Sequence, residues 1–198
     1  MIKIAVLVSG GGTNLQALID SWKKGDFASG ELSLVISSVP NVYALERAEK
    51  AGIKSVTIER KKYESIDEFD AAIEKTLTEN NIDLVVLAGF LSVVGPKVIN
   101  SFENKIINVH PSLIPSFCGK GYYGLKVHKA VLEYGVKITG ATVHFVNNVI
   151  DGGKIILQKA VEVLPDDTPE SLQQRVMREA EWVILSKAVA MFCKEELI

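Results

Sequence analysis

The stretch that decides the fold is KIAVLVSGGGTNLQALIDSW, residues 3–22. It joins a short apolar run, residues 3–8, to a glycine-rich loop, residues 9–14, and then to a helical pattern, residues 15–22. The apolar run lacks strict alternation, which is typical of a strand buried on both faces of a parallel sheet. The segment therefore predicts a strand, a loop and a helix that open an α/β domain.

The same alternation of apolar runs and helical patterns continues to about residue 110. Further strands are predicted at 32–37, 55–58, 84–88 and 106–109, and further helices at 43–51, 66–79 and 96–102. A helix near 126–134 then precedes two longer strands, 138–146 and 155–163, whose connection ends in Asp-Gly-Gly and indicates a hairpin. Thr168 and Pro169 begin a terminal helix that reaches about Cys193. We therefore predict one domain over residues 1–198, with a doubly wound, mostly parallel sheet, an antiparallel C-terminal hairpin and a terminal helix.

Composition excludes several classes of function. The net charge of -2 gives no broad field to hold nucleic acid or an anionic membrane. The two cysteines, Cys118 and Cys193, lack zinc-ligand spacing and suit reduced thiols. No apolar run is long enough for a signal peptide core or a membrane span. We expect a cytoplasmic protein, monomer or homodimer, that acts on small molecules without a metal, nucleic acid or membrane partner.

Two polar side chains lie at the end of the predicted strand 106–109. Asn108 and His110 are two residues apart and so share one face of the strand, and Pro111 tends to end the strand there. The pair would lie at a rim that a ligand can reach. Taken by themselves, Asn108 and His110 fit a structural role, in which His110 ends the strand and caps the loop, as well as they fit a catalytic role.

The loop Ser9-Gly10-Gly11-Gly12-Thr13-Asn14 is placed to bind an anion between a strand and a helix N-terminus. Leu15 stands where a dinucleotide fingerprint needs a small residue, and no acid closes the second strand. No Gly-Lys-Ser/Thr follows either, which excludes a P-loop. One phosphate on a small organic group fits better than a nucleotide, although a tight turn without a ligand remains the alternative reading.

Four motifs in order resemble the phosphoribosylglycinamide formyltransferases, the folate-dependent enzymes of purine synthesis. They are SGGGTNLQ at 9–16, LAGF at 87–90, NVHPSLIP at 108–115, and TVHFV at 142–146 with Asp-Gly-Gly at 151–153. The likeness runs essentially end to end. It implies a formyltransferase-like, Rossmann-type fold, 10-formyltetrahydrofolate as co-substrate without a metal, and transfer of the formyl group to the amine of N1-(5-phospho-D-ribosyl)glycinamide.

The resemblance also implies roles for individual residues. The family's catalytic Asn, His and Asp match Asn108, His110 and Asp151. The ribonucleotide phosphate falls to Gly12, Thr13 and Asn14, and a family glutamate that contacts the ribonucleotide matches Glu181, with one extra residue between Arg175 and Glu181. The folate pocket matches Leu91, Ser92, Val93, Val94, Asn108, Asn147, Asn148, Val149, Ile150 and Asp151.

Two departures concern the folate side. The family usually carries Arg where this chain has Ile66, in a loop near the folate tail, and often Arg at Ser92. Lys61 or Lys62 is a possible substitute. Trp182 also replaces a frequent His. These changes leave the formyl-transfer residues in place.

Formyl transfer develops negative charge on the formyl oxygen and needs no covalent nucleophile, because an amine attacks the formyl carbon directly. We expect Asn108 to donate a hydrogen bond to that oxygen and a cationic His110 to stabilise the same charge. Asp151 would hold His110 in its cationic form against the desolvation of the cleft. His128 and His144 are expected to be structural.

Other functions of the same fold stay in competition. Formyltetrahydrofolate deformylases carry an N-terminal regulatory domain and methionyl-tRNA formyltransferases a C-terminal tRNA-binding domain, and we expect neither here. Amino-sugar formyltransferases remain open, although the glycine-rich loop favours the ribonucleotide. From a different class, a catalytically inactive nucleotide-binding module would leave Asn108, His110 and Asp151 incidental.

Overall fold

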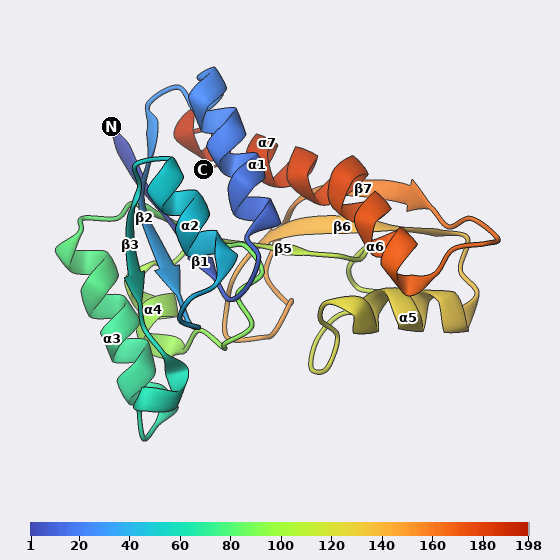
Figure 1. The fold of residues 1–198 in the computed structure, drawn as a ribbon, viewed down its shortest axis with the longest axis horizontal. Helices are drawn as coiled ribbons and strands as arrows, with labels where there is room; N and C mark the ends of the chain where they lie inside the picture. The colour runs from blue at the N-terminus through green and yellow to red at the C-terminus, as the bar shows by residue number, and fades with distance from the viewer. Residues whose placement is uncertain (198) are drawn as a thin grey trace.

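Seven strands form a single sheet in the order β3-β2-β1-β4-β5-β6-β7 (Figure 1). The structure is a computed structural model and describes residues 1–197. The strands are β1 (Ile2–Val8), β2 (Gly30–Ser37), β3 (Lys54–Thr57), β4 (Leu84–Leu87), β5 (Ile106–His110), β6 (Ile138–Phe145) and β7 (Ile155–Glu162). Strands β1 to β5 pair in parallel, whereas β5 with β6 and β6 with β7 pair antiparallel. The predicted sheet and C-terminal hairpin are confirmed.

The strand order reverses at β1, which lies between β2 and β4. The chain runs outward from β1 to β2 and β3, and then returns to pair β4 with the other edge of β1. In open parallel sheets, the loops leaving the carboxyl ends of two such strands run apart and leave a crevice between them. The glycine-rich loop after β1 and the segment after β4 border this crevice.

Helices cover the two faces of the sheet unequally (Figure 1). They are α1 (Thr13–Lys24), α2 (Tyr43–Lys50), α3 (Ile66–Glu79), α4 (Pro96–Ser101), α5 (Leu125–Tyr134), α6 (Pro169–Val176) and α7 (Trp182–Cys193). One apolar cluster joins α1, α2, α5, α6 and α7 to one face, and a second joins α3 and α4 to the other. The second cluster includes Ile106 of β5 but no residue of β6 or β7. This half of the second face is therefore left to polar side chains and loops.

The terminal helix is interrupted at Met177–Glu181, which forms a π-helical turn between α6 and α7. Thr168 caps the start of α6 and Pro169 occupies its first turn, as predicted. The prediction of a single continuous helix from 168 to 193 is wrong at this turn, where the chain is π-helical. A π turn takes up one residue more than an α turn. Regular α-helical structure resumes with α7 at Trp182.

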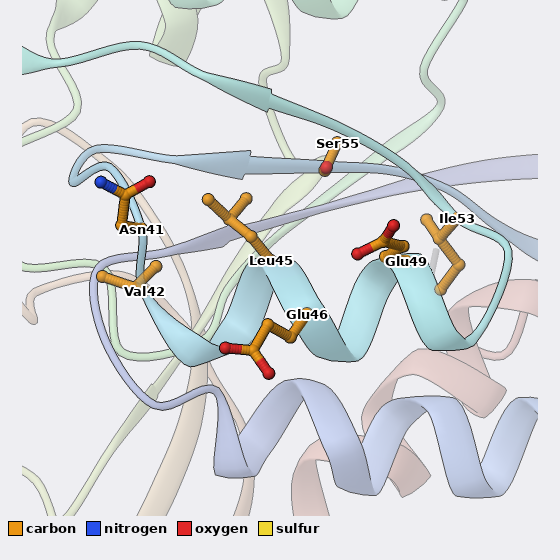
Figure 2. A pocket seen from close by; sticks show the side chains of 7 residues that line it. All are labelled: Asn41, Val42, Leu45, Glu46, Glu49, Ile53 and Ser55. Carbon is orange, nitrogen blue, oxygen red and sulfur yellow. The ribbon is translucent and has the colours of Figure 1, made fainter.

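A cavity of about 470 Å³ opens between α2 and β3, at the edge of the sheet (Figure 2). Two carboxylates, Glu46 and Glu49, line it, and none of its seven lining residues is basic. A phosphorylated substrate would meet only negative charge there. The cavity contains none of the residues expected at the functional site.

Candidate active site

The end of β5 presents Asn108 and His110 on the face that α3 and α4 leave open. Ile106 of the same strand belongs to the cluster on that face, whereas Ile107 and Val109 pack on the opposite one. Asn108 pairs with Leu87 of β4 on one side and with His144 of β6 on the other. The shared face that the sequence predicted is therefore present, and the antiparallel hairpin adds a second histidine to it.

The ring of His110 is almost fully buried and faces an oxygen atom at each nitrogen. Its Nε2 lies 2.9 Å from the carbonyl oxygen of Phe117, which can only accept, so this nitrogen carries a proton. Its Nδ1 lies 3.5 Å from Oδ2 of Asp151. An imidazolium in this position has an acceptor for each of its two N–H groups.

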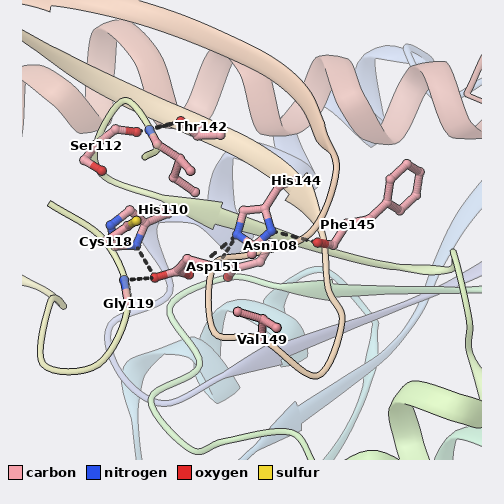
Figure 3. Close-up of polar contacts among 12 residues, drawn as sticks. Asn108, His110, Ser112, Cys118, Gly119, Thr142, His144, Phe145, Val149 and Asp151 are labelled. Carbon is pink, nitrogen blue, oxygen red and sulfur yellow. Dashed lines mark hydrogen bonds and ion pairs between the residues drawn. The ribbon is translucent and has the colours of Figure 1, made fainter. Parts of the chain in front are cut away.

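The carboxylate of Asp151 lies between two imidazole rings (Figure 3). Asp151 is in the loop between β6 and β7 and adopts φ 55, a left-handed conformation that Asp tolerates. Its Oδ2 accepts the N–H of Gly119 at 2.8 Å, and its Oδ1 lies 3.6 Å from Nε2 of His144. Burial alone raises the pKa of this carboxyl, but its contacts with the two imidazoles and the Gly119 amide hold the pKa below its ordinary value. Asp151 is therefore a carboxylate at neutral pH.

His144 belongs to this cluster, although the sequence predicted a structural role for it. Its Nδ1 lies 2.7 Å from the carbonyl oxygen of Phe145 and donates to it, and its Nε2, 3.6 Å from Oδ1 of Asp151, also lies at hydrogen-bond distance, 3.1 Å, from Nδ2 of Asn108. This bond fixes the orientation of the Asn108 amide. The hairpin register, in which His144 faces Asn108, was the missing signal.

The glycine-rich loop closes against α2. Gly12 caps α1 with φ 71, and a Cβ at this position would lie 2.7 Å from Cβ of Ala44. A Cβ at Gly10 or Gly11 would meet no atom within 4 Å. Space for a ligand therefore exists beside these two glycines, at the positive end of the α1 dipole.

A cation that sequence reasoning missed also reaches this loop. Nε of Arg47, on α2, donates to the carbonyl oxygen of Gly11 at 2.9 Å, and Nη1 donates to Gln16 at 2.8 Å. No local motif marks Arg47, because its approach depends on how α2 packs against the loop. It adds a positive charge where a phosphate was expected.

Asn14 and Glu181, 167 residues apart in the chain, meet in the interior. Nδ2 of Asn14 donates to Oε2 of Glu181 at 2.9 Å, and Oδ1 of Asn14 has no partner among the described residues. Burial raises the pKa of Glu181 to about 7, and the hydrogen bond from Asn14 only partly offsets that effect. The two residues expected at the ribonucleotide are thus brought together, with the side chain of Asn14 turned toward Glu181.

The residues expected to line the folate pocket form two exposed apolar groups. Leu91 and Val93 follow β4, and Val149 and Ile150 lie in the loop that carries Asp151; more than half of each side chain is exposed. Val94 differs, because it is buried in the core and offers little surface to a ligand. The rest of the expected set is partly or fully exposed: Ser92, Asn147, Asn148 and Ile66, which begins α3.

Two other titratable groups are poor candidates for catalysis. Burial and the negative charge of Asp151 raise the pKa of the Cys118 thiol, which disfavours a thiolate nucleophile. Burial, together with the nearby His110, lowers the pKa of His128 to about 4. His128 lies fully inside, so it is a neutral group in the core.

Within residues 1–197, no three side chains of the His, Cys, Asp or Glu type are grouped to hold a metal ion. Among the same residues, no helix combines the length and apolar character needed to cross a membrane.

Comparison with known proteins decides the family. A family model described as formyl transferase matches residues 2–189. The chain belongs to the formyl transferase family. Phosphoribosylglycinamide formyltransferase of Haemophilus influenzae is 40% identical over 197 residues, which cover 100% of this chain and 90% of that protein. Glycinamide ribonucleotide transformylase 1 from Symbiobacterium toebii has a similar structure, with a TM-score of 0.92, 42% identity, and coverage of 98% of this chain and 89% of that one.

Some relatives of this formyl transferase are much longer. The trifunctional purine biosynthetic protein adenosine-3 of Gallus gallus is 47% identical over 180 residues, which are 91% of this chain but only 17% of that protein. The chain therefore spans about one sixth of the length of these trifunctional relatives. The resemblance drawn from the four motifs is confirmed at the level of the family.

The glycine-rich loop yields a paired prediction. Gly12→Ala combines an unfavourable φ with a steric clash against Ala44, so we expect it to lower the free energy of unfolding by about 1–3 kcal/mol. Gly10→Ala meets open space and should leave stability within about 0.5 kcal/mol of the wild type. Thermal and urea unfolding of both variants would measure this, and equal losses would contradict the assigned packing.

Proposed function

We propose that this formyl transferase transfers the formyl group of 10-formyltetrahydrofolate to the amine of glycinamide ribonucleotide. The observation that carries the proposal is the cluster of Asn108, His110 and Asp151 at the end of β5, on the same edge of the parallel sheet as the glycine-rich loop. The Haemophilus influenzae and Symbiobacterium toebii relatives are named for this reaction, which supports the same substrate. No second function is favoured by an observation of its own.

In this proposal the amine nitrogen attacks the formyl carbon, and negative charge develops on the formyl oxygen. Asn108 is oriented by His144 and has a second amide N–H to give to that oxygen. His110 supplies the other donor through its Nε2–H. In this structure that N–H donates to the carbonyl oxygen of Phe117. The new C–N bond forms, the bond from the formyl carbon to the folate nitrogen breaks, and the proton lost by the amine is passed to that nitrogen.

Asp151 contributes through its charge. Its carboxylate lies 3.5 Å from Nδ1 of His110 and stabilises a positive ring while the oxyanion forms. The N–H of Gly119 keeps the carboxylate in place. Cys118 needs no part in the reaction, because alignment of the two substrates is sufficient for direct attack.

The ribonucleotide would lie along the glycine-rich loop. Backbone N–H groups near Gly12, Thr13 and Asn14 and the positive end of α1 suit its phosphate. Arg47 adds charge complementarity at Gly11. Glu181 would accept from the ribose hydroxyls and Asn14 would hold that carboxyl. The exposed apolar groups suit the flat pterin ring of the folate.

The remaining parts of the proposal concern context. We propose that residues 1–198 act as one formyltransferase domain, as a monomer or homodimer, in the cytoplasm, with 10-formyltetrahydrofolate as co-substrate and no metal. The free thiols of Cys118 and Cys193 are compatible with a reducing compartment.

The test is to incubate the protein with 10-formyltetrahydrofolate, with and without glycinamide ribonucleotide, and to follow formyl-folate absorbance and the formylated ribonucleotide. Consumption that requires the ribonucleotide and matches product formation is expected. Consumption without the ribonucleotide would indicate a hydrolase. No consumption under either condition would indicate a binding module and overturn the proposal.

Removal of His110 or of the Asp151 charge should impair turnover. We expect His110→Ala to lower kcat by about 10²–10³, the scale of losing one oxyanion donor, and Asp151→Asn to lower it through loss of the carboxylate charge. Cys118→Ser is the matched control and should keep near wild-type kcat. Steady-state kinetics at saturating concentrations of both substrates measures this, and near-normal turnover in His110→Ala would contradict the assignment.

Glu181 should make ribonucleotide binding depend on pH. Because its pKa is about 7, the carboxyl is mostly neutral below pH 7 and ionised above it, and the ionised form is the stronger acceptor for hydroxyl groups. The ratio of KM for the ribonucleotide in Glu181→Gln to that in the wild type should therefore rise between about pH 6 and pH 8. This ratio cancels titration of the substrate itself. A KM ratio that does not change with pH would exclude the proposed ribose contact.

A further inference from the structure

The segment between β4 and α4, residues 88–95, presents the first apolar group of the site without regular structure of its own. Leu91 is 66% exposed and Val93 is 59% exposed. Because Leu87 at the end of β4 pairs with Asn108, the segment leaves the sheet beside that residue. Because the segment lacks helix and strand hydrogen bonds, other contacts must hold Leu91 and Val93 in place near Asn108.

The middle of the segment, at Leu91, is held by the hydroxyl of Ser9. The Oγ atom of Ser9, just beyond β1, accepts the N–H of Leu91 at 2.9 Å. The same Oγ lies 2.7 Å from Oγ of Ser38, just beyond β2. Both serines are buried, so water competes little for these bonds. The chain of hydrogen bonds spans the ends of three neighbouring strands and crosses the crevice where the strand order reverses.

The last residue of the segment, Gly95, is held by the carboxylate of Asp70, on α3. Its oxygens accept the N–H groups of Gly95 at 2.7 Å, Lys97 at 2.8 Å and Val98 at 3.3 Å. Asp70 is only 1% exposed, so its negative charge is balanced mainly by the backbone N–H groups that begin α4.

Gly95 provides independent support for this contact. Its backbone, with φ -93, is open to any residue, so conformational freedom does not explain the glycine. A Cβ at Gly95 would lie 2.7 Å from Cγ and Oδ2 of Asp70. The glycine therefore allows the close approach of the carboxylate to the backbone. Side chains from outside the segment therefore hold it at Leu91 and at Gly95.

We propose that Ser9 and Asp70 are positioning residues for the folate co-substrate, which fix residues 91–94 as one wall of its site. The inference rests on the proposed formyl transfer and goes further, because neither residue lines the expected pocket. Ser9 also follows directly from β1 into the glycine-rich loop, so one hydroxyl connects the two substrate subsites. A residue that only stabilised the fold would not act selectively on the folate.

The first test removes each acceptor in turn. We expect Ser9→Ala to raise KM for 10-formyltetrahydrofolate by about threefold to tenfold, and Asp70→Ala by about tenfold or more, because buried N–H groups lose their partner. In both variants kcat should stay within about twofold of the wild type. For Asp70→Ala, KM for the ribonucleotide should also be unchanged.

Conservative variants provide the rescue. Ser9→Thr keeps the hydroxyl and Asp70→Asn keeps one acceptor oxygen, so each should have a KM for the folate between those of the alanine variant and the wild type. Asp167→Asn is the matched control, since Asp167 is another buried carboxylate, which accepts from Arg175 and the Leu164 N–H at the start of α6. It should lower thermal stability without changing KM for the folate.

A direct binding measurement separates this inference from the proposed function. Titration calorimetry with tetrahydrofolate should show that the wild type binds most tightly, the conservative variants less tightly and the alanine variants least tightly. If Asp70→Ala does not fold, Ser9→Ala alone tests the positioning role. A wild type that turns over or binds tetrahydrofolate, with wild-type values in Ser9→Ala, overturns the positioning role only. A wild type that neither reacts nor binds tetrahydrofolate overturns the proposed function and the positioning role together.

Discussion

The parallel pairing of β1 with both β2 and β4 is the constraint on which the rest of the molecule depends. Residues 4–8 of β1 are fully buried, because helices pack on both faces of that strand. With β1 fixed, the loop that follows it and the segment that follows β4 must leave the sheet at the same edge. The proposed phosphate and pterin subsites are neighbours for this reason.

Charge in the site is organised by one carboxylate. Asp151 reaches the end of β5 from a loop that begins beyond β6, and it contacts both His110 and His144. Its position depends on the antiparallel hairpin, on a left-handed backbone at Asp151 itself, and on the N–H of Gly119. Three separate parts of the chain must fold correctly before the cluster exists, which couples activity to the C-terminal half of the sheet.

Local patterns were sufficient to predict most of the fold. Apolar runs without alternation identified the buried strands, and the spacing of Asn108 and His110 placed both on one face. What local patterns did not reveal depends on long-range packing. His144 required the register of β6 against β5, Arg47 required the docking of α2 on the glycine-rich loop, and the hydrogen bond from Asn14 required the contact of α1 with the terminal helix. Nothing in a window of ten residues encodes these distances.

The π turn at Met177–Glu181 has a consequence for how such a chain changes during evolution. An insertion in an ordinary α-helix turns every later side chain by about 100° around the axis, so a single added residue would remove α7 from the core. A π turn holds one residue more within a single wide turn, and Glu181, at the end of this one, accepts a hydrogen bond from Asn14. The helix thus contains a turn that can accommodate one more residue without rotating α7 out of the core, and this turn ends at the buried Glu181.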